Sequence, residues 1–349
     1  MTGQPQLEVL APGAHAALQD AGRHGLRRVG VPWAGALDPR LMRLANALAG
    51  QPPQAAVIEA VDGGLRLAAR HGPVRLAVAG DAVLDLQTAD GRRAVPAWCA
   101  LTLQDGEVLT LRSLRRGRLA AVAVQGLAPA PVLGSASTYA RAGLGGVQGR
   151  ALRAGDVLPV AAAGPGPNLH LPQPPAWNDG PIRAVPGPQA DHFDAAALAA
   201  FTTTAWRLTA DADRMGVRLD GPALQHAGAR EIVSDATVPG SVQVPGNGLP
   251  IVLLADAQTA GGYPKIATVV SADLPRVAQL RPGATLHFQF VDVAAAEALA
   301  RAAEAETRAL LASLRPWWPG GLDIEALYTG NLVSGMLHAL APASHPDLD

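Results

Sequence analysis

Short runs of β-forming residues, separated by glycine and proline, constrain the fold of this chain more than any other feature. Five such runs are VRLAVAG (74–80), LAAVAVQ (119–125), PIVLLAD (250–256), IATVVSAD (266–273) and TLHFQFVDV (285–293). The 38 glycines and 30 prolines are spread along the chain and supply turns between the runs. Short strands between such turns are typical of barrels and sandwiches. The sequence therefore predicts a mainly β protein.

Three segments have the pattern of helices. In the first, DPRLMRLANALAG, Asp38 is placed to cap the helix, Pro39 occupies the first helical position and Gly50 follows the last turn. The second covers residues 191–201. The third is the alanine-rich segment 293–315, which we expect to be a C-terminal helix.

The organisation of the chain indicates two domains. Its 349 residues exceed what one hydrophobic core usually serves. The segment AAAGPGPNLHLPQPPAWNDGP is rich in proline and glycine, as linkers are. We predict an N-terminal domain over residues 1–170, a C-terminal domain over 181–292, and a C-terminal helix and tail over 293–349.

Composition narrows the class of protein further. Hydrophobic residues make up 49% of the chain and charged residues 16%, so a large core can form. The 28 basic and 29 acidic residues nearly balance, which gives no reason to expect nucleic acid or a membrane as partner. The single cysteine, Cys99, excludes an intrachain disulfide. Because we see neither a signal peptide nor an apolar run long enough to span a bilayer, we expect a cytoplasmic protein.

Several kinds of catalytic site are excluded by missing motifs. The chain has no G-x-x-x-x-G-K-[ST] loop, and no G-x-G-x-x-G follows a strand and opens a helix. The nine histidines show no H-x-x-x-H or H-x-H pairing, and one cysteine cannot build a thiolate site, so we expect no metal. No suitable serine pair accompanies the single lysine, as an amidase triad would require. Chemistry must then rest on Arg, Asp, Gln, Tyr, backbone amides and that lysine.

The only lysine, Lys265, ends the segment DAQTAGGYPK. Gly261 and Gly262 permit close approach of the backbone to a ligand and offer N–H donors to a carboxylate or phosphate. Lys265 would add a point charge, and Arg23 and Arg214 have the fork geometry that clamps an oxyanion.

Each of these residues also has a structural interpretation, which the sequence leaves open. Two glycines before Tyr-Pro are also a hairpin or bulge signal. Asp38 is at least as well placed to cap a helix as to act as a functional acid. Asp20 with Arg23, and Asp213 with Arg214, are suited to ion pairs that stabilise turns.

Long, ordered segments of this chain resemble one protein family. They are LQDAGRHGLRRVGVPWAGALDPRLMRLANALAGQPPQAAVIEAVDGG, LGSASTYARAGLGGVQGRALRAGDVLPV, DRMGVRLDGP and EIVSDATVPGSVQVPGNGLPIVLLADAQTAGGYPKIATVVSADLPRVAQLRPG. They are similar to the KipA / allophanate hydrolase subunit 2 family, also called the biotin-dependent carboxyltransferase family. That family includes the C subunit of the bacterial ATP-dependent 5-oxoprolinase. The resemblance extends from about residue 8 to about residue 290.

The resemblance implies a fold, partners and an activity. The fold would be two cyclophilin-like β-barrel domains with a few short helices. The partners would be a KipI-like subunit of the allophanate hydrolase subunit 1 type and, in 5-oxoprolinase, a LamB/YcsF-like subunit. Together they would open 5-oxo-L-proline, a small amide, to L-glutamate at the expense of ATP, which is bound by this chain or elsewhere in the complex.

Two alternatives stay open beside this main interpretation. The chain would otherwise act as a carboxyltransferase component, which moves a carboxyl group from carboxybiotin on another protein to urea or a related small amide. In the other alternative it is a KipA-like regulatory protein, which sequesters a KipI-like partner and turns over no substrate. Use of ATP without biotin and bicarbonate would speak against the first alternative.

The main interpretation assigns roles to particular residues. Phosphorylation of the amide oxygen, followed by attack of water, would need donors aimed at the developing negative charge. The candidate catalytic residues are Lys265, Asp20, Asp213 and Tyr263. The candidate substrate- or phosphate-binding residues are Arg23, Arg214, Gln243, Thr259, Gly261 and Gly262. In the tail, the residues expected to dock on a partner or on this chain are Trp317, Trp318, Leu327 and Met336.

Overall fold

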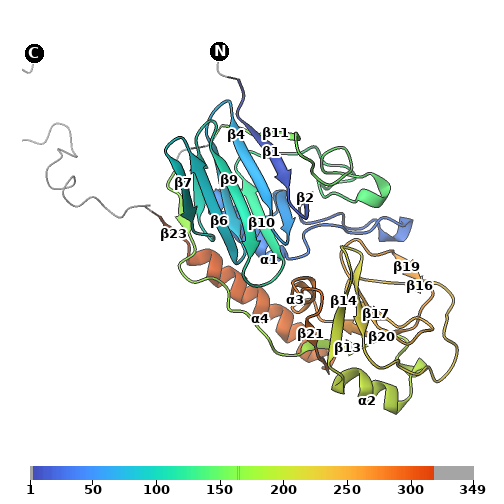
Figure 1. The fold of residues 1–349 in the computed structure, drawn as a ribbon. Helices are drawn as coiled ribbons and strands as arrows, with labels where there is room; N and C mark the ends of the chain where they lie inside the picture. Colours follow the sequence, from blue (N-terminus) through green and yellow to red (C-terminus); the bar gives the residue numbers. More distant parts are fainter. Residues whose placement is uncertain (1–2, 163, 165, 318–349) are drawn as a thin grey trace, which may run out of the picture.

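The computed structural model describes residues 3–162, 164 and 166–317, which form two β-rich domains lying end to end (Figure 1). The strands up to β11 build the first domain, and those from β13 to β22 build the second. The predicted boundaries at residues 170 and 181 stay a prediction. In this part of the chain, none of the helices combines the length and the apolarity needed to cross a membrane.

The N-terminal domain consists of two antiparallel sheets. The six-stranded sheet has the order β11 (Val157–Pro159), β1 (Gln6–Pro12), β4 (Leu65–Arg70), β9 (Val108–Leu114), β6 (Ala82–Thr88) and β7 (Gly91–Val95). The five-stranded sheet has the order β2 (His15–Gln19), β3 (Val57–Val61), β10 (Leu119–Val124), β5 (Val74–Ala79) and β8 (Ala100–Leu103). Strands of both sheets contribute to one hydrophobic core.

The position of strand β10 in the structure explains why its sequence, LAAVAV, is apolar throughout. Val122 and Val124 belong to the core between the two sheets. Ala121 and Ala123 point to the opposite face, because successive side chains of a strand alternate, and they belong to the core that includes helix α1 (Pro39–Ala49). A sheet covered on both faces needs apolar residues at every position of its central strands.

Helix α1 begins and ends where the sequence predicts. The carboxylate of Asp38 accepts hydrogen bonds from the backbone N–H groups of Arg40 at 3.1 Å and Leu41 at 3.2 Å. Pro39 is the first helical residue, and Gly50 ends the helix in the left-handed conformation with φ of 74°. The predicted cap is therefore confirmed as the structural role of Asp38.

The second predicted helix, over residues 191–201, is present with shifted bounds. A short 3-10 helix, η3 (Ala190–His192), comes first, and α2 (Ala195–Thr203) follows it. The reason for the shift is a new N-cap, because the Asp194 carboxylate accepts a hydrogen bond from the third residue of α2 at 2.7 Å.

The C-terminal domain is built on an eight-stranded sheet. Its order is β21 (Thr285–Leu286), β14 (Trp206–Ala212), β15 (Gly216–Asp220), β18 (Ile251–Leu253), β17 (Ser241–Gln243), β20 (Lys265–Val269), β13 (Ile182–Pro186) and β22 (Phe288–Phe290). The two edge strands, β21 and β22, are separated in the chain by His287 alone. The sheet therefore returns to its starting point and forms a nearly closed barrel.

Smaller elements complete the second domain. Two short strands, β16 (Asp235–Ala236) and β19 (Ala260–Gly261), pair outside the barrel sheet. The helix α3 (Leu274–Ala278) follows β20. The predicted fold class, mainly β with two barrel-like domains, few helices and a C-terminal helix, is confirmed.

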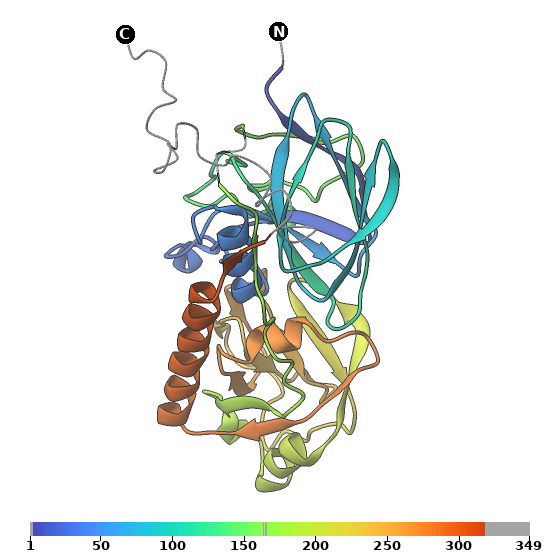
Figure 2. The ribbon, with the colours of Figure 1, turned by 90° about the vertical axis from the view of Figure 1, so that its left-hand side faces the viewer.

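The C-terminal helix α4 (Val293–Ala312) runs along the side of the molecule (Figure 2). Strand β23 (Arg315–Pro316) then pairs with β12 (Leu169–His170). The side chain of Trp317 packs on the core of the N-terminal domain, so the end of the described chain returns to that domain. The other tail residues for which docking is predicted, Trp318, Leu327 and Met336, lie outside the described residues.

One hydrophobic cluster extends across both domains. It includes Leu44 and Leu48 of α1 as well as Trp206 and Phe288 of the barrel. Because these side chains share a continuous core, the cleft between the domains has walls that are fixed relative to each other.

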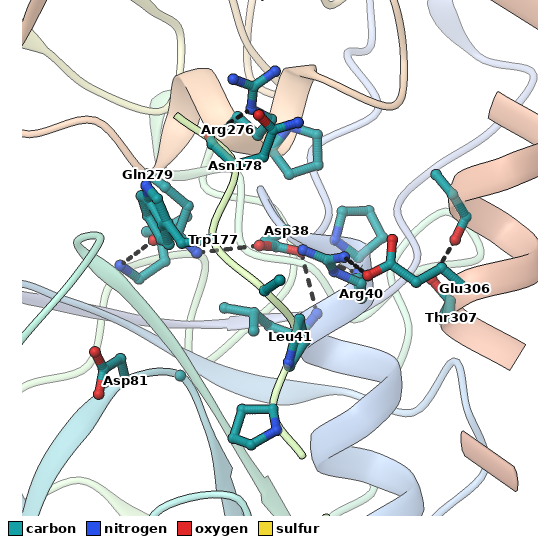
Figure 3. Close-up of a pocket in the computed structure, with 18 of the residues that line it drawn as sticks. Asp38, Arg40, Leu41, Asp81, Trp177, Asn178, Arg276, Gln279, Glu306 and Thr307 are labelled. Carbon is teal, nitrogen blue, oxygen red and sulfur yellow. Dashed lines mark hydrogen bonds and ion pairs between the residues drawn. The ribbon is translucent and has the colours of Figure 1, made fainter. Parts of the chain in front are cut away.

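Gln279 adds a polar link between the domains. Its Oε1 atom accepts hydrogen bonds from the backbone N–H groups of Arg118 and Leu119, each at 3.0 Å. Its Nε2 atom donates to Asp38 Oδ2 at 3.1 Å (Figure 3). The residue that follows α3 thus contacts both the cap of α1 and the start of β10.

Candidate functional site between the two domains

A cavity of about 350 Å³ lies between the two domains. A volume of this size suits a small molecule, and interfaces between domains are frequent ligand sites. The polar and charged side chains in its wall are His15, Gln19, Arg118, Thr138, Tyr139, Arg141, Asp213, Arg214 and Asp256. Both domains contribute residues to the wall, so neither domain forms the cavity by itself.

Arg214 crosses from the barrel to the N-terminal domain in this wall. Its Nε and Nη2 atoms donate to the two carboxylate oxygens of Asp256 at 3.1 and 2.9 Å. Its Nη1 atom donates to Glu59 of β3, and Nη2 also donates to the carbonyl oxygen of Gly35 at 2.6 Å. One buried guanidinium therefore holds two buried carboxyl groups, one from each domain.

Burial affects the ionisation of all three side chains, Arg214, Glu59 and Asp256. It raises the pKa of Glu59 and of Asp256, although the charge of Arg214 acts in the opposite direction. Burial alone would lower the pKa of Arg214, but the two carboxyl groups raise it above its ordinary value. Arg214 therefore remains a cation whose charge is already matched by this chain.

His15 of β2 lines the same cavity. Burial, and after it the charge of Arg214, lowers the pKa of His15 below its ordinary value of 6.5. The imidazole is therefore neutral at neutral pH and presents one nitrogen donor and one nitrogen acceptor. It is suited to accept a proton or a hydrogen bond from a ligand in the cavity.

Three residues of the wall keep a buried polar atom that has no hydrogen-bond partner within the described residues. These atoms are Gln19 Oε1, Thr138 Oγ1 and Arg118 Nε. Gln19 is 0% exposed and Thr138 is 2% exposed. An unpaired buried polar group costs about 1–3 kcal/mol, so native structures usually supply a partner. All three atoms are enclosed by protein, and Thr138 Oγ1 lies against Gly146, which is not part of the cavity wall.

Asp20 organises the segment that leads into the cavity. Its carboxylate accepts hydrogen bonds from the hydroxyls of Ser135 and Ser137, each at 2.5 Å, and from the backbone N–H groups of Ala136 at 2.6 Å and Gly22 at 2.8 Å. Burial opposes the ionisation of Asp20, but these hydrogen bonds outweigh it and lower the pKa below its ordinary value. The carboxylate thus positions the residues just before Thr138.

Arg23 holds the same segment through its backbone carbonyl groups. Its side chain is 1% exposed and donates to the carbonyl oxygens of Val132 at 3.0 Å, Ser135 at 3.2 Å and Ser137 at 2.5 Å. Gly145, with φ of 66°, lies against both Arg23 and the Ser137 carbonyl, where a Cβ atom would clash. The structure therefore gives Arg23 backbone partners from the N-terminal domain.

Lys265 belongs to a separate network in the barrel. Its side chain is 2% exposed, and its Nζ atom lies 2.8 Å from Asp235 Oδ2. The same oxygen accepts a hydrogen bond from Gln189 Nε2 at 3.1 Å. Lys265 is not part of the wall of the interdomain cavity.

Gln243 and Gly261 lie next to this network. Gln243 is paired with Lys265 between β17 and β20, and its Oε1 atom accepts a hydrogen bond from Gln258 Nε2 at 3.2 Å. A Cβ atom on Gly261 would lie 2.5 Å from Gln243 Nε2, so a larger residue there would displace the end of the Gln243 side chain. Gln243 Nε2 is buried and has no partner among the residues that the structure describes.

The remaining predicted residues of the barrel make backbone contacts or lie at the surface. The Thr259 carbonyl accepts a hydrogen bond from Thr237 N at 3.1 Å, and the Gly262 carbonyl accepts one from Ile232 N at 2.8 Å. Tyr263 is 39% exposed. Gly261 is part of β19, which pairs with β16, and both interpretations of the two glycines stay predictions.

The structure brings the predicted residues together in part. Asp213 and Arg214 line the cavity, and Asp20 and Arg23 position one of its walls. The expected meeting of Lys265 with both arginines is not seen, because each of the three binds different partners. Among the polar residues of the wall, sequence reasoning missed His15, Arg118, Thr138, Tyr139 and Arg141.

Thr138 and Arg141 had a signal in the sequence that could have found them. They lie in STYAR, within one of the segments that carry the family resemblance. Gln19 also lies in one of these segments, at the start of LQDAGRHG. His15 sits in strand β2 with no special pattern, and only the strand pairing places it at the cavity.

Comparison with known proteins places the chain in a family. The model of a carboxyltransferase domain, subdomain A and B, matches residues 29–290. The chain belongs to this carboxyltransferase family. It is 38% identical to the 5-oxoprolinase C subunit of Escherichia coli (strain K12) over 291 residues, which are 81% of this chain and 90% of that protein. It is 36% identical to the 5-oxoprolinase C subunit of Haemophilus influenzae over 302 residues, 84% of this chain and 94% of that protein.

A solved structure agrees with the carboxyltransferase assignment. The crystal structure of the Kluyveromyces lactis urea amidolyase is similar with a TM-score of 0.79 and 27% sequence identity. The match covers 89% of this chain but 20% of that chain. The carboxyltransferase domain is thus one part of a larger enzyme there.

A second cavity, of about 950 Å³, is lined by both domains, including α3 of the C-terminal domain, and by the linker and α4 (Figure 3). Every arginine in its wall is engaged in an ion pair. The pairs are Arg40–Glu306, Arg43–Glu304, Arg115–Asp81, Arg116–Asp179, Arg183–Asp273 and Arg276–Asp273. Each of these arginines has a carboxylate partner, with Asp273 shared by two of them, whereas Arg141 of the smaller cavity has no ion pair within the described residues. The smaller cavity is therefore the better candidate for binding an anionic ligand.

The N-termini of the longer helices in the described part of the chain do not offer the usual site for the phosphates of ATP. Helix N-termini bind phosphate through free backbone N–H groups. At the N-termini of α1, α2 and α4, the carboxylates of Asp38, Asp194 and Asp292 accept hydrogen bonds from one or two of these groups, and their negative charge would repel a phosphate. Within residues 3–162, 164 and 166–317, no three His, Cys, Asp or Glu side chains are grouped as metal ligands would be.

Proposed function

We propose that this chain is one subunit of an ATP-dependent complex that opens 5-oxo-L-proline to L-glutamate. The observation that carries the proposal is the similarity to two 5-oxoprolinase C subunits over 90% and 94% of their lengths. The interdomain cavity supports it, because it is small and lined by groups that can bind an amide.

In this proposal the chain binds and orients the lactam, and other subunits bind the nucleotide. The other subunits would be the KipI-like and LamB/YcsF-like proteins named by the family resemblance. Hydrogen-bond donors of the cavity would stabilise negative charge that develops on the lactam oxygen. The neutral imidazole of His15 would be available to accept a proton. We assign no step of ATP hydrolysis to this chain.

Reconstitution of the complex tests the proposal. The chain is co-expressed with the products of its neighbouring genes, and release of phosphate from ATP is measured with 5-oxo-L-proline or with urea. We expect phosphate release to depend on 5-oxo-L-proline and on the presence of this chain, with formation of L-glutamate. Phosphate release that is stimulated only by urea would reject the proposal.

Carboxyl transfer is the second candidate, and the family model together with the likeness to urea amidolyase supports it. In that case carboxybiotin on another protein would be the donor, and urea or a related small amide the acceptor. The same reconstituted complex would then require biotin and bicarbonate. Tight binding of a KipI-like partner without any turnover would instead indicate the regulatory alternative.

The predicted role of Lys265 as an oxyanion donor has its own test. This role requires the reacting atoms to lie beside Lys265 and not in the interdomain cavity, and Lys265→Met would then lower turnover in the complex at least tenfold. We expect the free energy of unfolding of the Lys265→Met chain to be only about 1–2 kcal/mol below that of the parent, because one charge-assisted hydrogen bond to Asp235 is lost. Turnover at the parental rate would remove Lys265 from the catalytic residues. Asp235→Asn serves as control, because it weakens the same ion pair and leaves the ammonium in place.

A further inference from the structure

We propose that one face of the molecule, built from residues 22–31, 131–135, 230–238 and 258–263, is where this chain docks another subunit of its complex. We call it the loop face. The partner surface that fits it is apolar at the centre and carries carboxylates at the border. The inference rests on the proposed function, in which the chain is one subunit of several, and deepens it by naming the surface and the chemistry of the partner.

Exposed apolar side chains gather on the loop face. Nine large hydrophobic side chains are exposed in the part of the chain that the structure describes. Six of the nine belong to the loop face, namely Val29, Val132, Leu133, Val233, Val238 and Tyr263. Single exposed hydrophobic residues are normal, but several of them on adjoining loops mark a surface that binds another protein.

Hydrogen bonds hold these loops against one another. Arg27 donates to the carbonyl oxygens of Thr237 at 2.6 Å and Gln258 at 3.0 Å, and so reaches from the N-terminal domain to the barrel. Arg23 donates to the carbonyl oxygen of Val132 at 3.0 Å, and the pairing of β16 with β19 joins the other two loops. The loops lie along one side of the molecule, around β16 and β19 (Figure 1). The surface is therefore preformed, which lowers the entropic cost of binding.

The turn at Leu133 presents an apolar side chain at some cost to the backbone. Leu133 and Gly134 have φ of 53° and 80° and connect Val132 with Ser135, which pair with each other. Asn, Asp or Gly usually occupies the first position of such a turn, because a bulky residue is unfavourable at positive φ. The leucine is nevertheless 54% exposed. A partner that covers it would account for an apolar residue at this position.

Charge on the loop face favours an acidic partner. Three arginines there form no ion pair within residues 3–162, 164 and 166–317: Arg27, Arg28 and Arg230. The nearby carboxylate of Asp235 is already held by Lys265 at 2.8 Å, which leaves Glu231 as the opposing charge. Two copies of the chain meeting through this face would bring like charges together, whereas carboxylates on another subunit would complement them.

Binding between purified full-length proteins tests the loop face. The probes are the KipI-like and LamB/YcsF-like products of the neighbouring genes, each titrated calorimetrically into this chain. We expect one of them to bind the parent, and Val29→Asp to weaken that binding at least tenfold, because it places a charge among the apolar side chains. Val293→Asp is the matched control, since Val293 is 65% exposed and Val29 64%, but Val293 begins α4, outside the loop face.

The outcomes of this titration are distinct. Parental binding by Val293→Asp together with weakened binding by Val29→Asp supports the inference, provided that thermal unfolding shows both variants to be folded. Equal binding by the two variants would overturn it, as would a parent chain that binds neither subunit. Sedimentation velocity adds a third outcome: a dimer of the parent that Val29→Asp dissociates would assign the face to a second copy and likewise overturn the inference.

A charge reversal tests the acidic border of the partner. We expect Arg28→Glu to weaken binding at least tenfold at low ionic strength and much less at high ionic strength, because salt screens exposed charges. Arg93→Glu is the control, at an exposed arginine of β7 that has no ion pair within the described residues. Parental affinity of Arg28→Glu at low salt would overturn the assignment of an acidic partner.

The reconstituted complex separates this inference from the proposed function. We expect Val29→Asp to abolish phosphate release that depends on 5-oxo-L-proline at low subunit concentration, and an excess of the partner subunit to restore it by mass action. Parental assembly and activity of Val29→Asp at every concentration would overturn the inference and leave the function intact. Assembly through the loop face without any ATP-coupled ring opening would reject the function and leave the inference.

Discussion

Replacement of Arg214 with methionine is expected to lower the free energy of unfolding by about 3–5 kcal/mol. The change removes the cation that holds Glu59 and Asp256, one from each domain, and leaves both carboxyl groups buried without it. Methionine keeps much of the volume, so the loss reports the charge and its hydrogen bonds. Urea denaturation, followed by circular dichroism and tryptophan fluorescence, measures it.

A matched control isolates the effect of burial in this prediction. Arg207 lies in the same barrel and its Nη2 atom is 2.7 Å from Asp220, but the two side chains are 62% and 45% exposed. Because exposed ion pairs contribute little, Arg207→Met should cost less than about 1 kcal/mol. If Arg214→Met is no more destabilising than this control, the interdomain ion pair does not have the importance assigned to it. Adding Glu59→Gln to Arg214→Met should recover part of the loss.

Replacement of Asp20 with alanine is expected to cost about 2–4 kcal/mol and to abolish measurable binding of 5-oxo-L-proline. The carboxylate accepts four hydrogen bonds from Gly22 and residues 135–137, and hydrogen bonds to a charged group contribute about 1.5–3 kcal/mol each without being additive. Without them the segment that carries Thr138 and Arg141 loses its position. The same chemical denaturation and a calorimetric titration with 5-oxo-L-proline measure the two effects.

The pH dependence of the Asp20→Ala effect has a defined sign. The pKa of Asp20 is lowered in the folded chain from its ordinary value of 3.8, so the carboxylate stabilises the fold above that pH. This contribution disappears as the pH falls through the lowered pKa. The difference in unfolding free energy between parent and Asp20→Ala should therefore be constant near neutrality and shrink below about pH 4. Asp211→Ala, at an exposed carboxylate of the barrel, should show no such difference.

Local features of this carboxyltransferase chain were predictable from the sequence because their causes are local. The Asp38 cap, the proline after it and Gly50 lie within one short segment, and they determine the bounds of α1. The mainly β fold class follows in the same way, from turn residues between apolar runs. The shift of α2 shows the limit, because the exact cap, Asp194, depended on which of several nearby acids faces the helix.

The candidate site was less predictable because its contacts are distant in sequence. Arg214 meets Glu59 across 155 residues, and Gln19 meets Thr138 across 119. No local pattern links such partners; only the pairing of strands brings them together. Lys265 looked functional for its rarity and its glycine neighbours, yet its partner, Asp235, comes from strand β16, 30 residues away. Whether it also has a catalytic role stays a prediction.

The way in which the barrel closes has a consequence for biosynthesis. Both edge strands come from residues 285–290, so the ring of strands cannot be completed until that stretch has left the ribosome. The sheets of the N-terminal domain, by contrast, are complete once β11 has emerged at Pro159. The first domain can therefore fold while the second is still being translated, and the half-made barrel with its open edges is the nascent species most in need of a chaperone.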